Sequence, residues 1–190
     1  MRKNMEFEDL YNNSIILIGP SGAGKSDVAE ELKKITGMKR KCIDDVSWEL
    51  RKNGVDKKFR NRQEFNLFML RSVMEDAKRS GEPGICDFGA GHSVYRDPKL
   101  FAEAKKLLGK FKNIVLLLPS ADPNESLRIM NARSKARDIS DNKFFLESPC
   151  NRELATITIY GNGRTQKEIA EAILEYIKNR DSKTEDKINE

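Results

Sequence analysis

One eight-residue pattern constrains the fold of this chain more than any other feature, namely Gly19-Pro20-Ser21-Gly22-Ala23-Gly24-Lys25-Ser26. An apolar run, residues 14–18, precedes it, and residues 24–35 after it carry apolar side chains at helical spacing. A buried strand that ends in such a glycine-rich turn lets backbone N–H groups point at phosphate oxygens. The following helix adds its positive N-terminal end. The pattern therefore predicts a binding site for the phosphates of a nucleotide.

The same pattern assigns roles to individual side chains. Lys25 is placed to reach the β- and γ-phosphates, and the hydroxyl of Ser26 is placed to bind Mg²⁺. We therefore expect ATP and Mg²⁺ as cofactors. The residues expected to contact the nucleotide are Gly19, Ser21, Gly22, Ala23, Gly24, Lys25, Ser26 and Asp27.

Apolar runs alternate with helix-period segments along the rest of the chain. This alternation is typical of an α/β fold, in which helices cover a mostly parallel sheet. The expected strands are residues 14–18, a strand ending at 42–44, 85–88, 113–118 and 155–160. The expected helices are residues 24–35, 46–52, 62–79, 98–108, 123–133 and 165–177.

Length and composition predict a single domain. The chain has 190 residues, and we expect the domain to cover residues 1–180, with a disordered tail at 181–190 that contains one apolar residue in ten. No apolar run approaches membrane-spanning length, and no secretory leader precedes the first strand. Three scattered cysteines form neither a disulfide framework nor a zinc motif, so we expect a reducing cytoplasm.

The net charge of +5 is modest and spread along the chain. Small basic clusters occur at residues 39–41, 51–52 and 57–58, but no block reaches five like charges. This distribution favours a small-molecule partner over nucleic acid.

Beyond the glycine-rich loop, the sequence resembles the shikimate kinase branch of the P-loop kinases over roughly residues 13–177. Asp44 matches the first aspartate of that family's Asp-x-Asp, which implies that it helps to hold Mg²⁺. Val46 stands at the second aspartate, whose carboxylate binds acceptor hydroxyls in the family, and Asp45 is the adjacent carboxylate. The resemblance therefore makes Asp45 a candidate for acceptor binding and predicts that shikimate itself is a poor acceptor.

Three further matches lie along the chain. Phe59-Arg60 resembles the family's Phe-Arg, which implies that Arg60 pairs with an acceptor carboxylate. The turn Gly89-Ala90-Gly91 resembles the glycines that floor the acceptor pocket. Residues 128–148 occupy the position of the lid, which implies that Arg133 and Arg137 reach the transferring phosphate.

Two other polar residues stand near the expected site. Asp87 ends a buried apolar run, and we expect it to bind Mg²⁺ through water or to accept a proton; the alternative is a cap of the following turn. His92 is the only histidine. It is a candidate to line the acceptor site or to act as a general base with a near-neutral pKa, and the alternative is a solvated loop residue.

These observations imply a three-layer α/β P-loop NTPase fold with a five-stranded, mostly parallel sheet. An acceptor-binding helical region is expected near residues 46–79 and a lid near residues 133–148. The implied activity is ATP- and Mg²⁺-dependent phosphoryl transfer to a small, hydroxylated, anionic metabolite. Two alternatives stay open: an NTPase or nucleotide switch without an acceptor, and a kinase directed at nucleotides or RNA.

Overall fold

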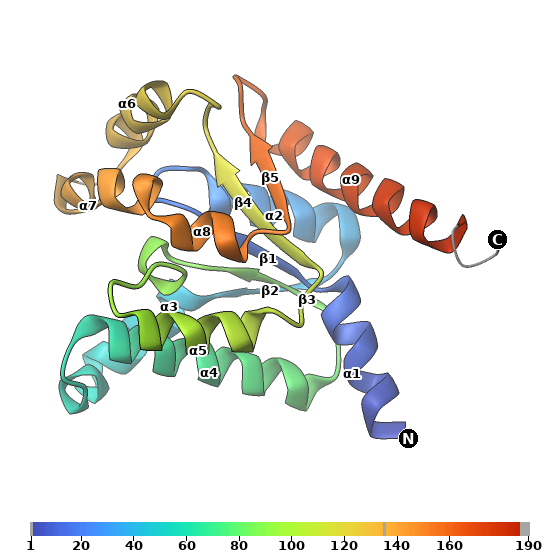
Figure 1. The fold of residues 1–190 in the computed structure, drawn as a ribbon, viewed down its shortest axis with the longest axis horizontal. Helices are drawn as coiled ribbons and strands as arrows, with labels where there is room; N and C mark the ends of the chain where they lie inside the picture. The colour runs from blue at the N-terminus through green and yellow to red at the C-terminus, as the bar shows by residue number, and fades with distance from the viewer. Residues whose placement is uncertain (1, 135, 187–190) are drawn as a thin grey trace.

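The computed structural model describes the backbone of residues 2–134 and 136–186, and the side chains of residues 7–134 and 141–182. Within this part, five strands form one sheet in the order β2-β3-β1-β4-β5, and every neighbouring pair is parallel (Figure 1). The expected five-stranded α/β fold is thereby confirmed. The strands are β1 (Ile15–Ile18), β2 (Lys39–Cys42), β3 (Gly84–Asp87), β4 (Asn113–Leu118) and β5 (Ile157–Tyr160).

The two central strands of the sheet, β1 and β4, are fully buried and stabilise the fold by hydrophobic packing. Every residue of β1 and β4 is buried, as expected for parallel strands that are covered on both faces. Ile16 of β1 lies between Cys86 of β3 and Ile114 of β4 in the register. At the edge, β2 reads Lys-Arg-Lys-Cys, and charged side chains of this kind protect an edge strand from pairing with other chains.

Helices cover both faces of the sheet and complete the three layers. On one face, α2 (Lys25–Thr36) and α9 (Gln166–Asp186) lie side by side, with Leu32 and Ile173 in the core between them and the sheet (Figure 1). On the other face, α4 (Arg62–Ser80), α5 (Pro98–Leu108) and α8 (Pro149–Leu154) enclose a second core.

Three more helices gather near the carboxyl ends of the strands, on the left of Figure 1. They are α3 (Ile43–Lys52), α6 (Pro123–Arg133) and α7 (Ala136–Glu147). In open parallel sheets, ligands bind at this edge. No helix in residues 2–134 and 136–186 combines the length and the hydropathy needed to cross a bilayer.

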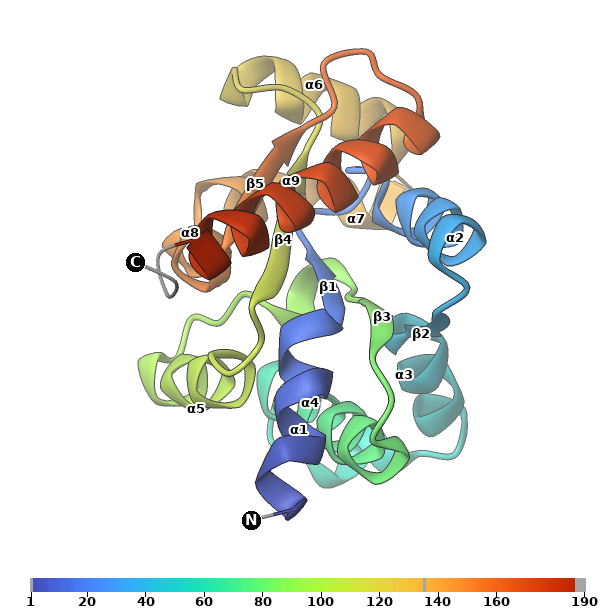
Figure 2. The ribbon, with the colours of Figure 1, turned by 90° about the vertical axis from the view of Figure 1, so that its right-hand side faces the viewer.

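The sequence did not predict the first helix, α1 (Arg2–Asn13), which leads into β1 (Figure 2). Among its described side chains, a short stripe of apolar residues anchors it, and the backbone N–H of Lys112 donates a hydrogen bond to the carbonyl oxygen of Tyr11 at 2.9 Å. Leu10 is fully buried, and the ring of Tyr11 meets the ring of Phe111 edge-on at 5.0 Å between centroids. Tertiary contacts of this kind, rather than local helix propensity, stabilise a short helix with many polar residues.

Two expected boundaries are wrong. The second strand ends at Cys42, and α3 begins at Ile43, so Asp44 lies in the first turn of a helix and not on a strand. At the other end of the chain, α9 continues to Asp186, so residues 181–186 are helical and not disordered. Residues 187–190 lie outside the described part, and the boundary of the domain at residue 180 stays a prediction.

Candidate active site

A cavity of about 860 Å³ opens at the carboxyl ends of the strands. The loop between β1 and α2 lines it together with α3 and the turn after β3. The end of α6 and the middle of α7 complete the wall. The fold therefore brings the glycine-rich loop, the residues after β2 and the turn after β3 around one space.

Positive φ angles shape the glycine-rich loop, because Gly19, Gly22 and Gly24 have φ values of 136°, 76° and 92°. Gly22 also packs closely: a Cβ at this position would lie 2.6 Å from the carbonyl oxygen of Met130 and 2.8 Å from Oγ of Ser134. The loop thus lies directly against the end of α6. The residues of the loop that face the cavity are Ser21, Gly22, Gly24, Lys25, Ser26 and Asp27, with Gly19 and Ala23 behind them.

Lys25 is buried at the loop, where its Nζ donates a hydrogen bond to the carbonyl oxygen of Pro20 at 2.8 Å. Burial lowers the pKa of Lys25, and the negative charges of Asp87 and Asp44 partly oppose this effect. A buried ammonium is costly without a compensating charge. An anion bound in the cavity would supply that charge, as a nucleotide phosphate does.

Asp87 is held by an ion pair behind the cavity wall. Its Oδ2 accepts a hydrogen bond from Nη2 of Arg40 at 2.7 Å, and Nη1 of Arg40 donates to Oε1 of Glu30 at 2.6 Å. Asp87 is only 2% exposed and is not among the residues that face the cavity. The expected roles of Asp87, to bind Mg²⁺ through water or to accept a proton, therefore stay predictions, while its charge acts on Lys25.

Asp44 faces the cavity from the first turn of α3, and its side chain is 66% accessible. Desolvation by the surrounding walls raises its pKa, and Lys25 acts in the opposite direction. A Cβ at Gly89 would lie only 2.5 Å from Cγ of Asp44, so the missing side chain lets the carboxylate rest against the turn. The structure thus brings together Asp44 and the Gly89–Gly91 turn, which the sequence had singled out separately.

Asp45 and the rest of the turn also face the cavity. Asp45 lines it beside Asp44, whereas Val46 packs against the hydrophobic core. After β3, Ala90 and Gly91 lie on the cavity wall. The carboxylate that Val46 lacks is therefore present one residue earlier in α3.

His92 is part of the same wall and is only 3% exposed. Its Nδ1 lies 3.3 Å from the carbonyl oxygen of Gly89 and 3.8 Å from Oδ1 of Asp44. Burial lowers the pKa of His92 to about 3. The ring is therefore not a solvated loop residue, and its pKa is not near neutrality; a place on the wall of the acceptor site stays a prediction.

The burial of His92 predicts a pH dependence of stability. The unfolded chain binds a proton at the ordinary histidine pKa of 6.5, while the folded chain resists it until about pH 3, so stability falls as the pH drops below 6.5. We expect the free energy of unfolding to fall by about 1 kcal/mol between pH 6.5 and pH 5.5. Urea unfolding of the metal-free protein measures this change, and His92→Gln should remove it. An equal slope in the variant would contradict the prediction.

One face of α3 adds three side chains to the expected Asp44. Asp44, Ser47, Trp48 and Arg51 follow the helical spacing i, i+3, i+4, i+7, and all four line the cavity. This spacing places the four side chains on one helix face only when α3 is known to begin at Ile43.

A second arginine on the cavity wall is Arg62, the first residue of α4, and not the expected Arg60. Arg60 is exposed and lies outside the cavity wall, with its backbone N–H bonded to Oε2 of Glu64. Oδ1 of Asn61 accepts hydrogen bonds from the N–H groups of Gln63 and Glu64, and this cap sets where α4 begins. In the sequence, the only indication that Arg62 rather than Arg60 faces the cavity is the asparagine between them, which is a typical helix-capping residue.

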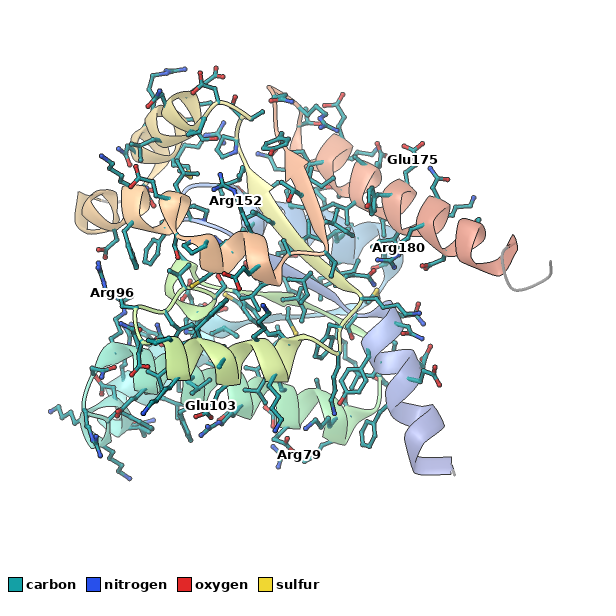
Figure 3. All side chains as sticks on the ribbon, in the orientation of Figure 1. Arg79, Arg96, Glu103, Arg152, Glu175 and Arg180 are labelled. Atoms are coloured by element: carbon teal, nitrogen blue, oxygen red, sulfur yellow. The ribbon has the colours of Figure 1, made fainter. Side chains whose placement is uncertain are left out.

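The expected lid corresponds to α6 and α7. Arg133, the last residue of α6, and Phe145 of α7 line the cavity, while Arg137 lies in α7 with its side chain outside the described part. Cζ of Arg96 lies 3.8 Å from the ring centroid of Phe144, so Arg96 contacts α7 from below (Figure 3). Asn142 joins α7 to α6 through a hydrogen bond to Oγ of Ser134 at 3.0 Å.

Several solved structures of small-molecule kinases are similar to this chain. The shikimate kinase of Acinetobacter baumannii, solved with shikimate, has a TM-score of 0.64 and 20% identity over 93% of this chain and 97% of its own. A gluconokinase from Sinorhizobium meliloti has a TM-score of 0.62 and 14% identity over 93% and 98%. The shikimate kinase of Aquifex aeolicus has a TM-score of 0.58 and 18% identity over 88% and 97%.

No family model and no curated protein sequence matches this chain. Similarity at 14–20% identity establishes the fold alone. The neighbours nevertheless cover nearly all of the chain, and this chain itself has the parallel sheet and the glycine-rich loop directly after β1. The chain thus has the fold of the shikimate kinase-like P-loop kinases.

Proposed function

We propose that this protein transfers the γ-phosphoryl group of ATP, with Mg²⁺, to a small, hydroxylated, anionic acceptor. One observation carries the proposal: a single cavity is lined both by the phosphate loop with Lys25 and by carboxylates and guanidinium groups of α3, α4 and α6. A nucleotide switch would not require these additional charged groups, because it binds no acceptor. The solved kinases with this fold act on small molecules, which supports the same reading.

The nucleotide end would act by positioning and charge neutralisation. Backbone N–H groups of the loop and Nζ of Lys25 would hold the phosphates. Mg²⁺ usually takes one or two protein oxygens together with substrate phosphates. The hydroxyl of Ser26 and the carboxylate of Asp44, both on the cavity wall, fit that requirement. When bound, Mg²⁺ would neutralise charge on the phosphates. Asp87, held by Arg40, would support the charged form of Lys25.

The acceptor end would bind and orient the attacking hydroxyl. Ala90, Gly91 and His92 form its floor, and Arg62 takes the place expected for Arg60. The hydroxyl oxygen would form a bond to the γ-phosphorus while the bond from this phosphorus to the β–γ bridging oxygen breaks, which leaves ADP. The hydroxyl proton would pass to the carboxylate of Asp45.

The lid would complete the site. Arg133 already faces the cavity, and Arg137 follows it in α7. Their charges would stabilise the transferring phosphoryl group while α7 excludes water. Phe145, which also faces the cavity, would provide an apolar part of that cover.

A phosphoryl-transfer screen tests the proposal. The purified protein is incubated with ATP, Mg²⁺ and single hydroxylated metabolites, and both ADP and the phosphorylated product are measured. We expect at least one hydroxy acid to raise ADP release well above the rate with ATP alone, with one phosphorylated product formed for each ADP. ATP turnover that no acceptor changes would contradict a kinase and favour an NTPase or a switch.

A further inference from the structure

A network of ion pairs lies behind the phosphate loop, where α2 packs against β2 and β3. Arg40 of β2 is its centre: Nη2 donates a hydrogen bond to Oδ2 of Asp87 at the end of β3, and Nη1 donates to Oε1 of Glu30 in α2. The side chain of Asp87 is 2% accessible and that of Arg40 18%, whereas that of Glu30 is 43% accessible. The bond between Arg40 and Asp87 is therefore the buried part of the network.

The stability of the fold alone does not account for a buried ion pair of this kind. Apolar side chains of similar volume often stabilise a fold as well as a buried ion pair does, or better. Nε of Arg40 is also buried without a hydrogen-bond partner in the described part of the chain, which adds a desolvation cost. The place of the two charges, directly behind the phosphate loop, is therefore more informative than their contribution to stability.

Asp87 also acts on Lys25. Burial lowers the pKa of Lys25, and among the opposing negative charges that of Asp87 acts most strongly. Nζ of Lys25 donates its hydrogen bond to the carbonyl oxygen of Pro20, while the hydrogen bond to Oδ2 of Asp87 comes from Arg40. Two cations thus share one buried carboxylate, and Arg40 binds it directly. Without Arg40, this carboxylate would need another cation, and it already attracts Lys25.

We propose that Arg40 is a positioning residue for phosphate binding: it holds Asp87, so that the ammonium of Lys25 binds the β- and γ-phosphates of ATP and does not pair with that carboxylate. The inference rests on the part of the proposed function that assigns Lys25 to the phosphates. It adds a residue of β2, a strand that lies outside the cavity wall. Arg40 does not touch the nucleotide and acts through Asp87.

Binding of ATP with Mg²⁺ tests the inference without an acceptor. Arg40→Met should weaken binding by about 10-fold or more, because the unpaired carboxylate of Asp87 then draws the ammonium of Lys25 away from the phosphates. Adding Asp87→Asn to Arg40→Met removes that carboxylate, so the double variant should bind ATP about 5-fold or more tightly than Arg40→Met alone. In isothermal titration calorimetry, the stoichiometry reports the folded fraction and the dissociation constant reports the site.

Arg40→Gln replaces Arg40→Met if the latter does not fold. The glutamine amide still donates a hydrogen bond to Asp87 but carries no charge. It should therefore weaken ATP binding in the same direction, by about 3-fold or more.

A double-mutant cycle with Lys25 separates positioning from a structural role. In a chain that already carries Lys25→Met, Asp87 has no ammonium to attract at the loop. Arg40→Met should then change the affinity for ATP by less than about 3-fold. A structural role of Arg40 would instead lower the affinity by the same factor in both backgrounds.

Two control variants alter neighbouring charges. Glu30→Ala removes the second carboxylate that Arg40 binds and leaves the bond to Asp87 in place, so it should bind ATP within about 3-fold of the wild type. Lys39→Met changes another cation of β2, whose side chain is 85% accessible and pairs with Glu82, and it should bind ATP like the wild type.

Four results would overturn the inference. Arg40→Met might bind ATP as tightly as Lys39→Met does, or the double variant with Asp87→Asn might bind no more tightly than Arg40→Met. The effect of Arg40→Met could equally persist at full size beside Lys25→Met, or Glu30→Ala could weaken binding as much as Arg40→Met. In each case, phosphorylation of an acceptor in the wider screen would leave the proposed function standing. A wild-type protein that binds no ATP would overturn both.

Discussion

Lys25→Met is expected to lower acceptor-dependent ATP turnover by about 10³-fold, the largest effect of any single substitution in this chain. The ammonium is the positive charge that the structure places at the phosphate loop, and methionine keeps most of its volume. The fold should not suffer, because burial lowers the pKa of Lys25 and the folded chain therefore disfavours its charged form. The midpoint of thermal unfolding without nucleotide should not fall by more than about 4 °C.

The matched control is Lys33→Met on the same helix. Lys33 is 53% exposed and lies 3.7 Å from a carboxylate oxygen of Glu30, an exposed pair that contributes little. Its turnover should equal that of the wild type. Initial rates of ADP release at saturating ATP and acceptor measure both variants. Turnover of Lys25→Met within 10-fold of the wild type would refute the assignment of Lys25.

Asp44→Asn is expected to lower kcat by about 10²-fold or more and to raise the Mg²⁺ concentration needed for half-maximal rate. The amide has nearly the shape of the carboxylate but not its charge. Because the side chain of Asp44 is 66% accessible, loss of its charge should leave the stability of the fold nearly unchanged. Reduced activity at undiminished stability would identify a functional carboxylate.

Gly89→Ala provides an independent test of the same carboxylate. The added Cβ would lie 2.5 Å from Cγ of Asp44, so the carboxylate must move. Displacement of a positioned group should lower kcat by roughly 10-fold to 10²-fold. Glu49→Gln changes an exposed carboxylate of α3 outside the cavity wall, so it is the control and should leave kcat unchanged.

Normal kcat and normal Mg²⁺ dependence in Asp44→Asn would show that Asp44 takes no part in the mechanism.

Strong local patterns account for the parts of the fold that the sequence predicts well. The helix Pro98–Leu108 and the strand Asn113–Leu118 have the expected bounds, because proline starts the helix and the apolar run of the strand is unbroken. The helix α1 lacks such a pattern and depends on a few contacts with the rest of the fold. The start of α3 was missed because Ile43 is apolar and suits both a strand and a buried helix position.

The phosphate-binding residues could be predicted from the sequence because they are contiguous. The acceptor-binding residues were harder to predict, because they depend on which face of a helix turns toward the cavity. An offset of two residues separates Arg60 from Arg62, and only the capping of α4 by Asn61 decides between them. Asp87 and His92 were noticed for their chemistry, but their partners and burial come from segments distant in sequence.

The contact between Gly22 and α6 limits which sequences this loop can carry. The pattern G-x-x-x-x-G-K-[ST] leaves the position of Gly22 open to any residue. In this chain, two features exclude a side chain at position 22. The backbone has a φ of 76°, and an added Cβ would lie 2.6 Å from the carbonyl oxygen of Met130. Random replacement at position 22 should therefore return glycine alone among active clones. Natural variation there would have to be accompanied by changes at the end of α6, so the two segments are expected to diverge together.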